Sequence, residues 1–583
     1  MRAFLRAIPF LLAASAAPGA PPEPTLPAPA GIFPISDLKP GHAGEVWTVF
    51  HGTKPEPFAV EVTGIVRNAL GPGKSLIVCR LTDPRVQNMG AVAGMSGSPL
   101  YIGGRLAGAL SYQIQSFETV HYAGFTPAVD LAEVENQVDD PAPASVAEAD
   151  PGGFAARGFR PLRPVFILSG LSPRVADLMK PYLDALGLST ASLGGSLDPA
   201  IPTGPGPALQ PGDAVSVALA TGDITLAGTG TVSRVDGDRV VAFGHTMMNL
   251  GSIELPLCSA EIITIVPSAL ESLKIANTGP VIGTITQDRL SAVSGILGRR
   301  PDMIDVDITV ASGHAGERRL HFQVARQQQL TPTLIATGLT QAIAGSNDAG
   351  LSSGFRLNSD VTFSPTQRLA SRILYAGPQA FTLGLGDFVR QLAQDLQNPY
   401  EKMFPRRIAF TVEPLEENPA VTIDQFQLSR STARPGDTVE ATLAWRDYQG
   451  AAHLESIAIP IDSAWLGKKL EVILAPGHAL DELMGRPQVI AAAQLRSFDA
   501  YLAAMRDDRP NDGLCLAVAE ESALFTDQGE PTPELPDSLA RIAAAADDSR
   551  FQQRAALWPL WERHVLPGKL AAAVIRRPLR VAN

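Results

Sequence analysis

Strand-length apolar segments separated by glycine- and proline-containing turns run through the first two thirds of this sequence. Glycine and proline contribute 52 and 49 of the 583 residues, a content typical of chains with many tight turns. GEVWTVFHG and PFAVEVTGIV alternate apolar and polar residues, and KSLIVCRL is a continuous apolar run of the kind found in buried strands. Gly103-Gly104 and Asp236-Gly237 each separate two such segments and predict hairpin turns. The pattern predicts a mainly β fold.

The length predicts several folding units, and composition shifts suggest where they divide. Four short segments between residues 420 and 475 have the spacing of a β-sandwich, and the stretches after residue 480 are rich in Ala, Leu and Arg, which favours helix. An acidic, proline-containing stretch is typical of a linker. We therefore expect a first strand-rich region at 32–135, a linker at 136–160, a second strand-rich region at 161–300, a mixed, mostly β extension at 301–418, an Ig-like β-sandwich at 419–478 and a helical C-terminal region at 479–583.

The N-terminus has the pattern of an export signal. Arg2 and Arg6 precede an apolar stretch, and Ala14-Ser15-Ala16 has the small-residue form of a cleavage site. The stretch is too short to span a membrane, and no other segment is long and uncharged enough to do so. We expect a signal peptide at 1–17, a Pro-rich tether at 18–31, and a bacterial protein exported to the periplasm or the medium without a membrane span. An uncleaved N-terminal anchor is the alternative.

The ionisable residues exclude several classes of function. The chain has 47 basic and 59 acidic residues and a net charge of −12, so no electrostatic case exists for nucleic-acid binding. Its three cysteines, Cys79, Cys258 and Cys515, lie far apart with no CxxC pair, and its nine histidines form no HxH or HExxH pair. GPGKS at 71–75 lacks the first glycine of a phosphate-binding loop and is better explained as a turn between strands. We expect no metal and no cofactor.

One group of residues has the pattern of a nucleophilic site. In Gly94-Met95-Ser96-Gly97-Ser98-Pro99, glycines bracket Ser96, and a tight turn of this kind exposes a hydroxyl while the N–H groups of Gly94 and Ser96 point to one spot, as an oxyanion hole requires. A serine needs a base, and His245 follows a buried-type strand. Asp83, at the end of another such strand, could orient an imidazole. Each residue also has an ordinary structural explanation: a glycine-rich turn, a hydrogen-bonded histidine, and a carboxylate that caps backbone N–H groups.

The residues around these positions resemble a known family. LTDPRVQNMGAVAGMSGSPLYIGGRLAGALSY is similar to the nucleophile region of the stage IV sporulation protein B (SpoIVB) serine peptidases, and GTGTVSRVDGDRVVAFGHTMMNLGSIELP is similar to their histidine region. The resemblance implies a chymotrypsin-like double β-barrel endopeptidase that acts on a protein or peptide substrate, with the regions at 32–135 and 161–300 as the two halves of its core. It also implies that Ser96 is the nucleophile, His245 the general base and Asp83 the orienting acid.

The order of the two blocks departs from the family, in which the histidine block comes first. Triads are defined by geometry and occur in several chain orders, so the reversal implies a circularly permuted core without excluding catalysis. Asp213, Asp223 and Asp288 also lie near the histidine block in the sequence and are alternatives to Asp83 as the orienting acid. Two functions are therefore considered: an exported serine endopeptidase that cleaves a protein or itself, and a catalytically inactive, protease-like envelope scaffold or binding protein.

Overall fold

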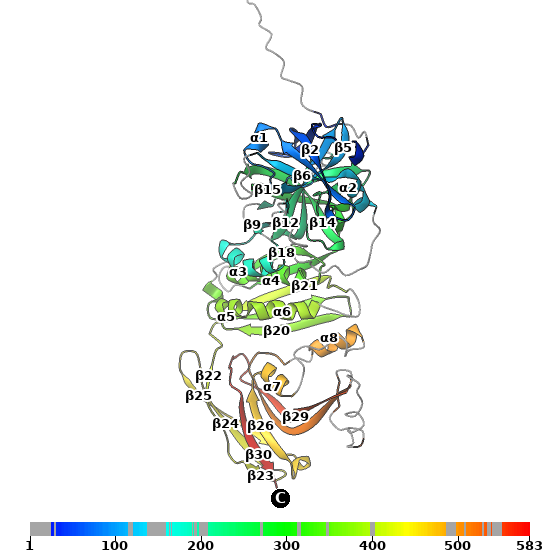
Figure 1. Cartoon of the computed structure of the whole chain (residues 1–583). Helices are drawn as coiled ribbons and strands as arrows, with labels where there is room; N and C mark the ends of the chain where they lie inside the picture. The colour runs from blue at the N-terminus through cyan, green and yellow to red at the C-terminus, as the bar shows by residue number, and fades with distance from the viewer. Residues whose placement is uncertain are drawn as a thin grey trace, which may run out of the picture.

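The computed structural model shows an elongated molecule, with the N-terminal sheet at one end and the C-terminal strands at the other (Figure 1). The predicted signal peptide and most of the predicted tether and linker lie outside the described residues. The structure describes residues 25–27, 31–114, 120–136, 159–162, 164, 166–188, 190–191, 195–196, 208–268, 272–311, 316–345, 349–396, 403–484, 497–506, 509–527, 530–532, 538 and 551–583.

A seven-stranded sheet forms the N-terminal end of the molecule. Its strands are ordered β4-β1-β2-β3-β6-β5-β7, and β4 also pairs with β5, so six of them form a closed ring of hydrogen-bonded neighbours. Val46, Ile77, Leu100 and Phe125 belong to the core inside this ring. The elements, in chain order, are η1 (Ile35–Asp37), β1 (Ala43–Val49), β2 (Pro55–Gly71), β3 (Lys74–Leu81), α1 (Pro84–Gln87), β4 (Pro99–Ile102), β5 (Arg105–Ile114), β6 (Tyr122–Pro127), α2 (Ala128–Glu135) and β7 (Phe159–Pro161).

The second sheet has the same kind of closure. The pairings β11–β14, β14–β15, β15–β16, β16–β13, β13–β12 and β12–β11 return to the strand at which they start. The predicted hairpin at Asp236-Gly237 is confirmed between β12 and β13, as is the one at Gly103-Gly104 between β4 and β5. The elements are β8 (Phe166–Ser169), α3 (Pro173–Ala185), β9 (Thr190–Ala191), β10 (Gly195–Ser196), β11 (Ala214–Gly222), β12 (Thr225–Asp236), β13 (Arg239–Ala242), β14 (Gly251–Val266), β15 (Leu273–Arg289) and β16 (Ala292–Leu297).

This second sheet continues through β18 into the middle of the molecule, where helices join it. Helix α4 contacts α3, α6, β17 and β18, and almost all of its residues are buried. The elements are β17 (Met303–Val310), β18 (Arg318–Ala325), α4 (Thr331–Ala344), η3 (Ala349–Leu351), β19 (Phe355–Thr362), β20 (Arg368–Tyr375), α5 (Pro378–Leu383), α6 (Leu385–Leu396) and β21 (Arg407–Pro414).

The C-terminal part is two sheets packed face to face, and the helical region predicted at 479–583 is wrong for most of its described residues. One sheet is β22-β24-β25, and the other contains β23, β30, β26, β27, β28 and β29. The elements are β22 (Thr422–Leu428), β23 (Thr432–Ala433), β24 (Thr438–Arg446), β25 (Ala452–Pro460), η4 (Ser463–Trp465), β26 (Lys469–Ala475), α7 (Gly477–Leu483), α8 (Phe498–Arg506), β27 (Leu514–Asp527), β28 (Glu530–Thr532), β29 (Phe551–Val565) and β30 (Ile575–Val581).

Strand β27 shows why helix was wrongly predicted in this region. Leu514, Leu516 and Val518 pack into the core between the two sheets, while Cys515 and Ala517 pack into a second cluster on the opposite face, which also contains residues of α7. A strand buried on both faces loses the alternation that identifies strands, and an alanine- and leucine-rich run then resembles a helix.

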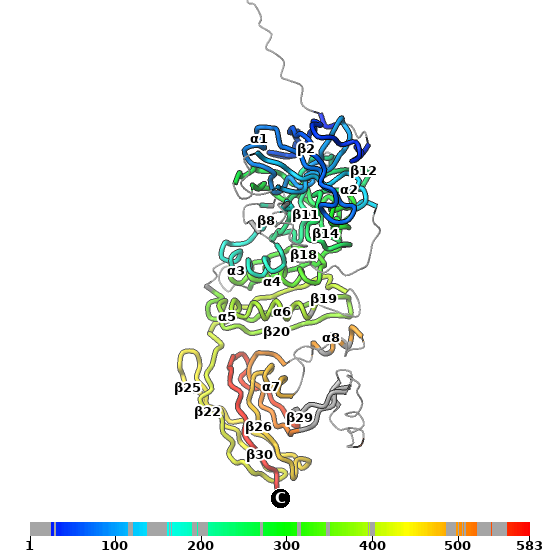
Figure 2. Tube along the Cα trace, viewed as in Figure 1, coloured from blue at the N-terminus to red at the C-terminus, as the bar shows by residue number. Residues whose placement is uncertain are grey.

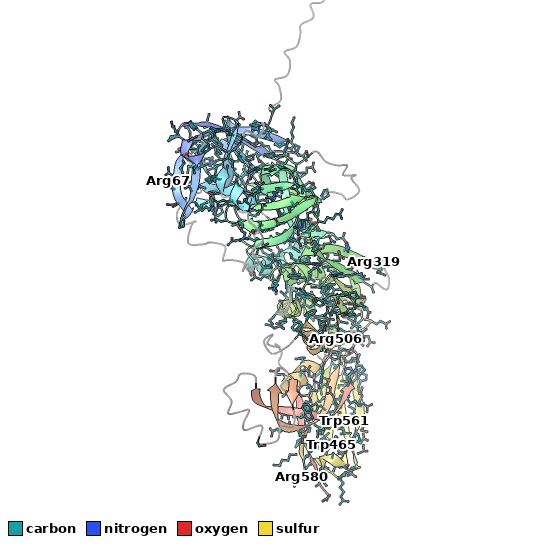
Figure 3. All side chains as sticks on the ribbon, turned by 90° about the vertical axis from the view of Figure 1, so that its right-hand side faces the viewer. Arg67, Arg319, Trp465, Arg506, Trp561 and Arg580 are labelled. Carbon is teal, nitrogen blue, oxygen red and sulfur yellow. The ribbon has the colours of Figure 1, made fainter. Side chains whose placement is uncertain are left out.

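The two closed rings contact each other through a hairpin arm of the second sheet (Figure 2). Strands β14 and β15 extend beyond their own ring, and Ile262 exchanges backbone hydrogen bonds with Gly52 at 2.7 and 2.8 Å. Figure 3 shows Arg67 at the end of the molecule that carries the first ring, with Trp465 and Trp561 at the other end. Among the described residues, no helix is both long and apolar enough to cross a membrane.

Candidate active site

Ser96 lies in a tight turn that precedes β4. Three N–H groups of this turn are hydrogen-bonded: Met95 donates to the carbonyl of Val92 at 2.9 Å, Ser98 to that of Met95 at 3.0 Å, and Gly97 to that of Leu110 at 2.7 Å. The Ser98 hydroxyl also donates to the Met95 carbonyl at 2.7 Å. The turn is therefore fixed from within and by β5.

The two remaining N–H groups of the turn are the ones expected to form an oxyanion hole. Within the described part of the chain, the amides of Gly94 and Ser96 have no hydrogen-bond acceptor, although both residues are buried. Buried backbone donors without a partner are rare in proteins and call for an explanation. A pair of such donors, two residues apart and flanking a serine hydroxyl, is suited to receive a negatively charged oxygen.

The carbonyl groups of the same turn are bound by the second sheet. Thr231, on β12, donates its N–H to the Ser96 carbonyl at 2.8 Å and its hydroxyl to the Gly94 carbonyl at 3.1 Å. Ser233 donates its hydroxyl to the Gly97 carbonyl at 2.8 Å. The nucleophile turn belongs to the first sheet in sequence, but β12 of the second sheet holds it in place.

Gly97 brings the turn against the strand end that leads to His245. Its φ is +93°, and a Cβ at this position would lie 2.5 Å from the Phe243 nitrogen and would collide with the Thr231 carbonyl oxygen. Only glycine permits this approach of two backbones. The serine block and the histidine block, distant in sequence, are thus in direct backbone contact.

His245 follows β13 in a constrained segment. Phe243 has a φ of +68°, which is uncommon for an aromatic residue, and strained backbone of this kind concentrates at functional sites. The Thr126 hydroxyl, from β6 of the first sheet, donates to the Gly244 carbonyl at 2.6 Å. The His245 side chain is 1% exposed and packs edge-on against the Phe243 ring.

The tautomer of His245 follows from one contact. Its Nδ1 lies 2.6 Å from the carbonyl oxygen of Thr246. Because a carbonyl oxygen only accepts hydrogen bonds, Nδ1 carries the proton, and in the neutral ring Nε2 carries the lone pair. This is the form in which an imidazole acts as a general base.

Asp288, on β15, anchors the loop that supplies this carbonyl. Its buried carboxylate accepts the Thr246 hydroxyl at 2.8 Å and the N–H groups of Met247, Met248 and Leu250 at 2.7, 2.8 and 3.1 Å. The loop thus wraps around a single carboxylate, and charge-assisted hydrogen bonds from its backbone hold it there. Asp288 therefore acts on His245 indirectly, by fixing the position of Thr246.

Asp83 does not occupy the orienting position expected for it. It caps α1, and its carboxylate accepts the Arg85 N–H at 2.9 Å and also pairs with the Arg85 guanidinium. The hydrogen bond to the Arg85 side chain lowers the pKa of Asp83 below its usual value. The structure therefore shows Asp83 as a carboxylate that caps backbone N–H groups.

The two other aspartates near the histidine block are also engaged elsewhere. Asp213 accepts the Gln210 N–H at 2.8 Å, and burial raises its pKa to about 6. Asp223 accepts the His321 N–H at 2.7 Å. Of the three alternatives, Asp288 alone is bonded to the loop that follows His245, but no local motif distinguished it in the sequence.

Ser96 itself is fully buried, and its hydroxyl forms no hydrogen bond with any described group. The serine–histidine hydrogen bond of a poised catalytic pair is therefore not made in this structure. Such bonds are often long in unliganded enzymes and tighten only when a substrate binds. A substrate would reach the hydroxyl only after the groups that cover it move.

Among the described residues, no group of three or more His, Cys, Asp or Glu side chains could hold a metal ion.

Comparison with known proteins gives one match. Residues 23–126 match the model of the SpoIVB peptidase S55 family, which confirms the resemblance seen in the sequence for the segment that carries Ser96. His245 and Asp288 lie outside the matched residues. No curated protein and no solved structure matches the chain.

Proposed function

We propose that this chain is an exported serine endopeptidase of the SpoIVB type that cleaves a protein substrate or itself, with Ser96 as nucleophile and His245 as general base. The observation that carries the proposal is the turn around Ser96. Two N–H groups without an acceptor among the described residues flank the serine hydroxyl, and the turn packs on the strand end that leads to a histidine whose Nδ1 is hydrogen-bonded.

In the proposed reaction, His245 Nε2 accepts the proton of the Ser96 hydroxyl while Oγ attacks the scissile carbonyl. The negative charge that develops on the substrate oxygen is stabilised by the N–H groups of Gly94 and Ser96. The imidazolium then gives its proton to the leaving amine, and an acyl group remains on Ser96. Water, activated by the same imidazole, releases the acyl group and restores the serine.

The residue that orients the His245 imidazole differs from the one expected from the sequence. We assign the orientation of His245 to the Thr246 carbonyl, which Asp288 holds in place, and not to Asp83. A carbonyl fixes the tautomer as an aspartate does, but it adds no negative charge next to the imidazolium. The developing charge would be balanced by Asp288 from a greater distance.

The arrangement of the strands supports a permuted double-barrel core as part of the same proposal. Each sheet contains one closed ring of six strands, and the Ser96 turn and the His245 loop lie where the two rings meet. In this arrangement the ring that carries the serine comes first in the chain. Export is proposed from the N-terminal signal pattern alone.

A non-catalytic scaffold is the second candidate function. The observation in its favour is that Ser96 is fully buried and makes no hydrogen bond to His245. A degenerate peptidase that retains the fold for binding would show the same feature.

A fluorophosphonate probe, which reacts covalently with an activated serine, tests the two candidates directly. The probe should label the purified chain, and Ser96→Ala should abolish labelling. Ser98→Ala is the matched control, because Ser98 lies in the same turn, is equally buried, and only donates to the Met95 carbonyl. Labelling that survives in Ser96→Ala, or no labelling of a folded wild-type chain by probes of different size, would favour the scaffold.

A further inference from the structure

Lys274, at the start of β15, is a lysine whose amine is enclosed by protein. The residue is 2% exposed, and its Nζ donates to the hydroxyl of Thr48 at 2.8 Å. Thr48 lies on β1 of the first sheet and is itself fully buried. Among the described residues, no carboxylate pairs with this amine. The contact joins the two sheets through their interior.

The same residue borders the turn that carries Ser96. Its backbone N–H donates to the Ala93 carbonyl at 3.0 Å, and the Ala93 N–H donates to the Ser272 carbonyl at 2.8 Å. Its Cβ, Cγ and Cδ atoms lie 3.0 to 3.3 Å from where a Cβ on Gly94 would be. The lysine stem is therefore one wall of the proposed oxyanion site, because Gly94 supplies one of its two donors.

The surroundings of the amine favour its uncharged form. A buried ammonium without a counter-ion is strongly disfavoured, and such a group releases its proton instead. Burial lowers the pKa of Lys274 to about 7.

Among the described residues, the ionisable groups on the elements packed around Lys274 are engaged or face outward. The sequence from Asn88 to Ser98 contains no charged residue. Glu56, opposite Thr48 in the sheet, pairs with Arg85, and Glu45 on β1 is exposed. Glu261, on β14, is half-buried across from Asn277. Of the titratable groups of the candidate site, Asp288 is engaged by the loop after His245, and His245 is bonded to the Thr246 carbonyl.

We propose that Lys274 is a positioning residue of the candidate active site, whose uncharged amine, bonded to Thr48, holds the Ser96 turn in place. Protonation puts an unpaired charge between the two sheets, and opening of the turn toward water relieves it. The inference rests on the proposed function for its effect on catalysis, but the opening of the turn can be measured in a protein without activity.

The catalytic test is the pH dependence of fluorophosphonate labelling in wild type and in Lys274→Met. Methionine keeps the apolar stem next to Gly94 and cannot be protonated. In wild type, two groups must lose a proton, His245 and Lys274, so the logarithm of the labelling rate should rise with a slope approaching two on the acid side. The slope should fall to one in Lys274→Met. Lys74→Met is the matched control, because Lys74 is a half-buried lysine whose amine pairs with Asp130 and Glu133, and it should keep the wild-type slope.

The second test is hydrogen–deuterium exchange of the Met95 and Gly97 N–H groups, corrected for the intrinsic effect of pH. When the turn opens, Lys274 regains its ordinary pKa of about 10.4, whereas in the closed turn its pKa is about 7. Between these values the open form holds a proton that the closed form lacks, so raising the pH favours the closed form. The opening equilibrium should fall about tenfold per pH unit from pH 7 to 9 in wild type, and should not change with pH in Lys274→Met.

The outcomes separate this inference from the proposed function. If wild type and Lys274→Met have the same labelling slope and the same exchange, Lys274 has no positioning role, even if Ser96 is labelled. If the chain is never labelled but only wild type shows pH-dependent opening, the peptidase proposal fails and the role of Lys274 in holding the turn stands.

Discussion

Replacement of Asp288 by asparagine removes the negative charge at the centre of the loop after His245 while keeping the size of the side chain. Oδ1 accepts the Thr246 hydroxyl and the Met247 N–H, and Oδ2 accepts the N–H groups of Met248 and Leu250. An asparagine keeps one acceptor oxygen, so two of these four donors would face an amide nitrogen that cannot accept.

The size of the effect follows from those two donors. A buried donor left without a partner costs about 1–3 kcal/mol, so the loop would lose about 2–6 kcal/mol of local stability. The Thr246 carbonyl would then no longer be fixed against His245 Nδ1. A displacement of about 1 Å in a catalytic group can lower a rate about 100-fold, and we expect a loss of this order in the labelling of Ser96.

The assay is the second-order rate of fluorophosphonate labelling, measured together with a thermal melt. Asp236→Asn is the matched control, because Asp236 is 63% exposed and pairs only with Arg234 at the surface; its labelling should match that of wild type. If Asp288→Asn does not fold, Thr246→Val keeps the Asp288 charge but removes the hydrogen bond from the Thr246 hydroxyl to Asp288 and the one from the Asn249 N–H to that hydroxyl. It should give a loss of labelling in the same direction. An Asp288→Asn chain that is folded and labelled at the wild-type rate would refute the role given to Asp288.

Two further substitutions test the remaining assignments. Asp83→Asn should leave the labelling rate essentially unchanged and lower stability by no more than about 1 kcal/mol, since only the cap of α1 and the pairing with Arg85 are weakened; a large loss of labelling in a folded variant would restore Asp83 to the triad. Gly97→Ala should abolish labelling and destabilise the contact between the rings by several kcal/mol, of order 3 or more, because its Cβ would meet the backbone of Thr231 and Phe243. Gly103→Ala, at a hairpin turn with open space around it, is the control: it should cost about 1 kcal/mol, and an equal effect of the two changes, seen in thermal melts and labelling, would contradict the argument.

Local features of the candidate site could be predicted from the sequence. The glycines of GMSGSP require a tight turn, and the strand patterns on either side place that turn before a hairpin. His245 was expected at the end of a buried-type strand, and it follows β13 directly. These predictions succeed because turn chemistry and apolar periodicity depend on neighbouring residues alone.

The third site residue could not be predicted in this way. Asp83 has the better local setting, since it lies near Ser96 at the end of a strand, but that same setting makes it a helix cap. Asp288 has no local signature. Its role arises because the pairing of β14 with β15 returns the chain to Gly251, just after the His245 loop.

The sequence by itself determined the mainly β class, the turns, and the positions of Ser96 and His245 relative to their own strands, because each depends on short-range rules. The tertiary structure decided which distant residues complete the site. Thr231 binds the nucleophile turn, Asp288 anchors the histidine loop, and the amine of Lys274 lies between the sheets. It also decided that β27 is a strand, because burial on both faces overrides the helix preference of its residues. Hydrogen bonds and burial between segments far apart in the chain leave no periodic signal within either segment, so only the folded arrangement reveals them.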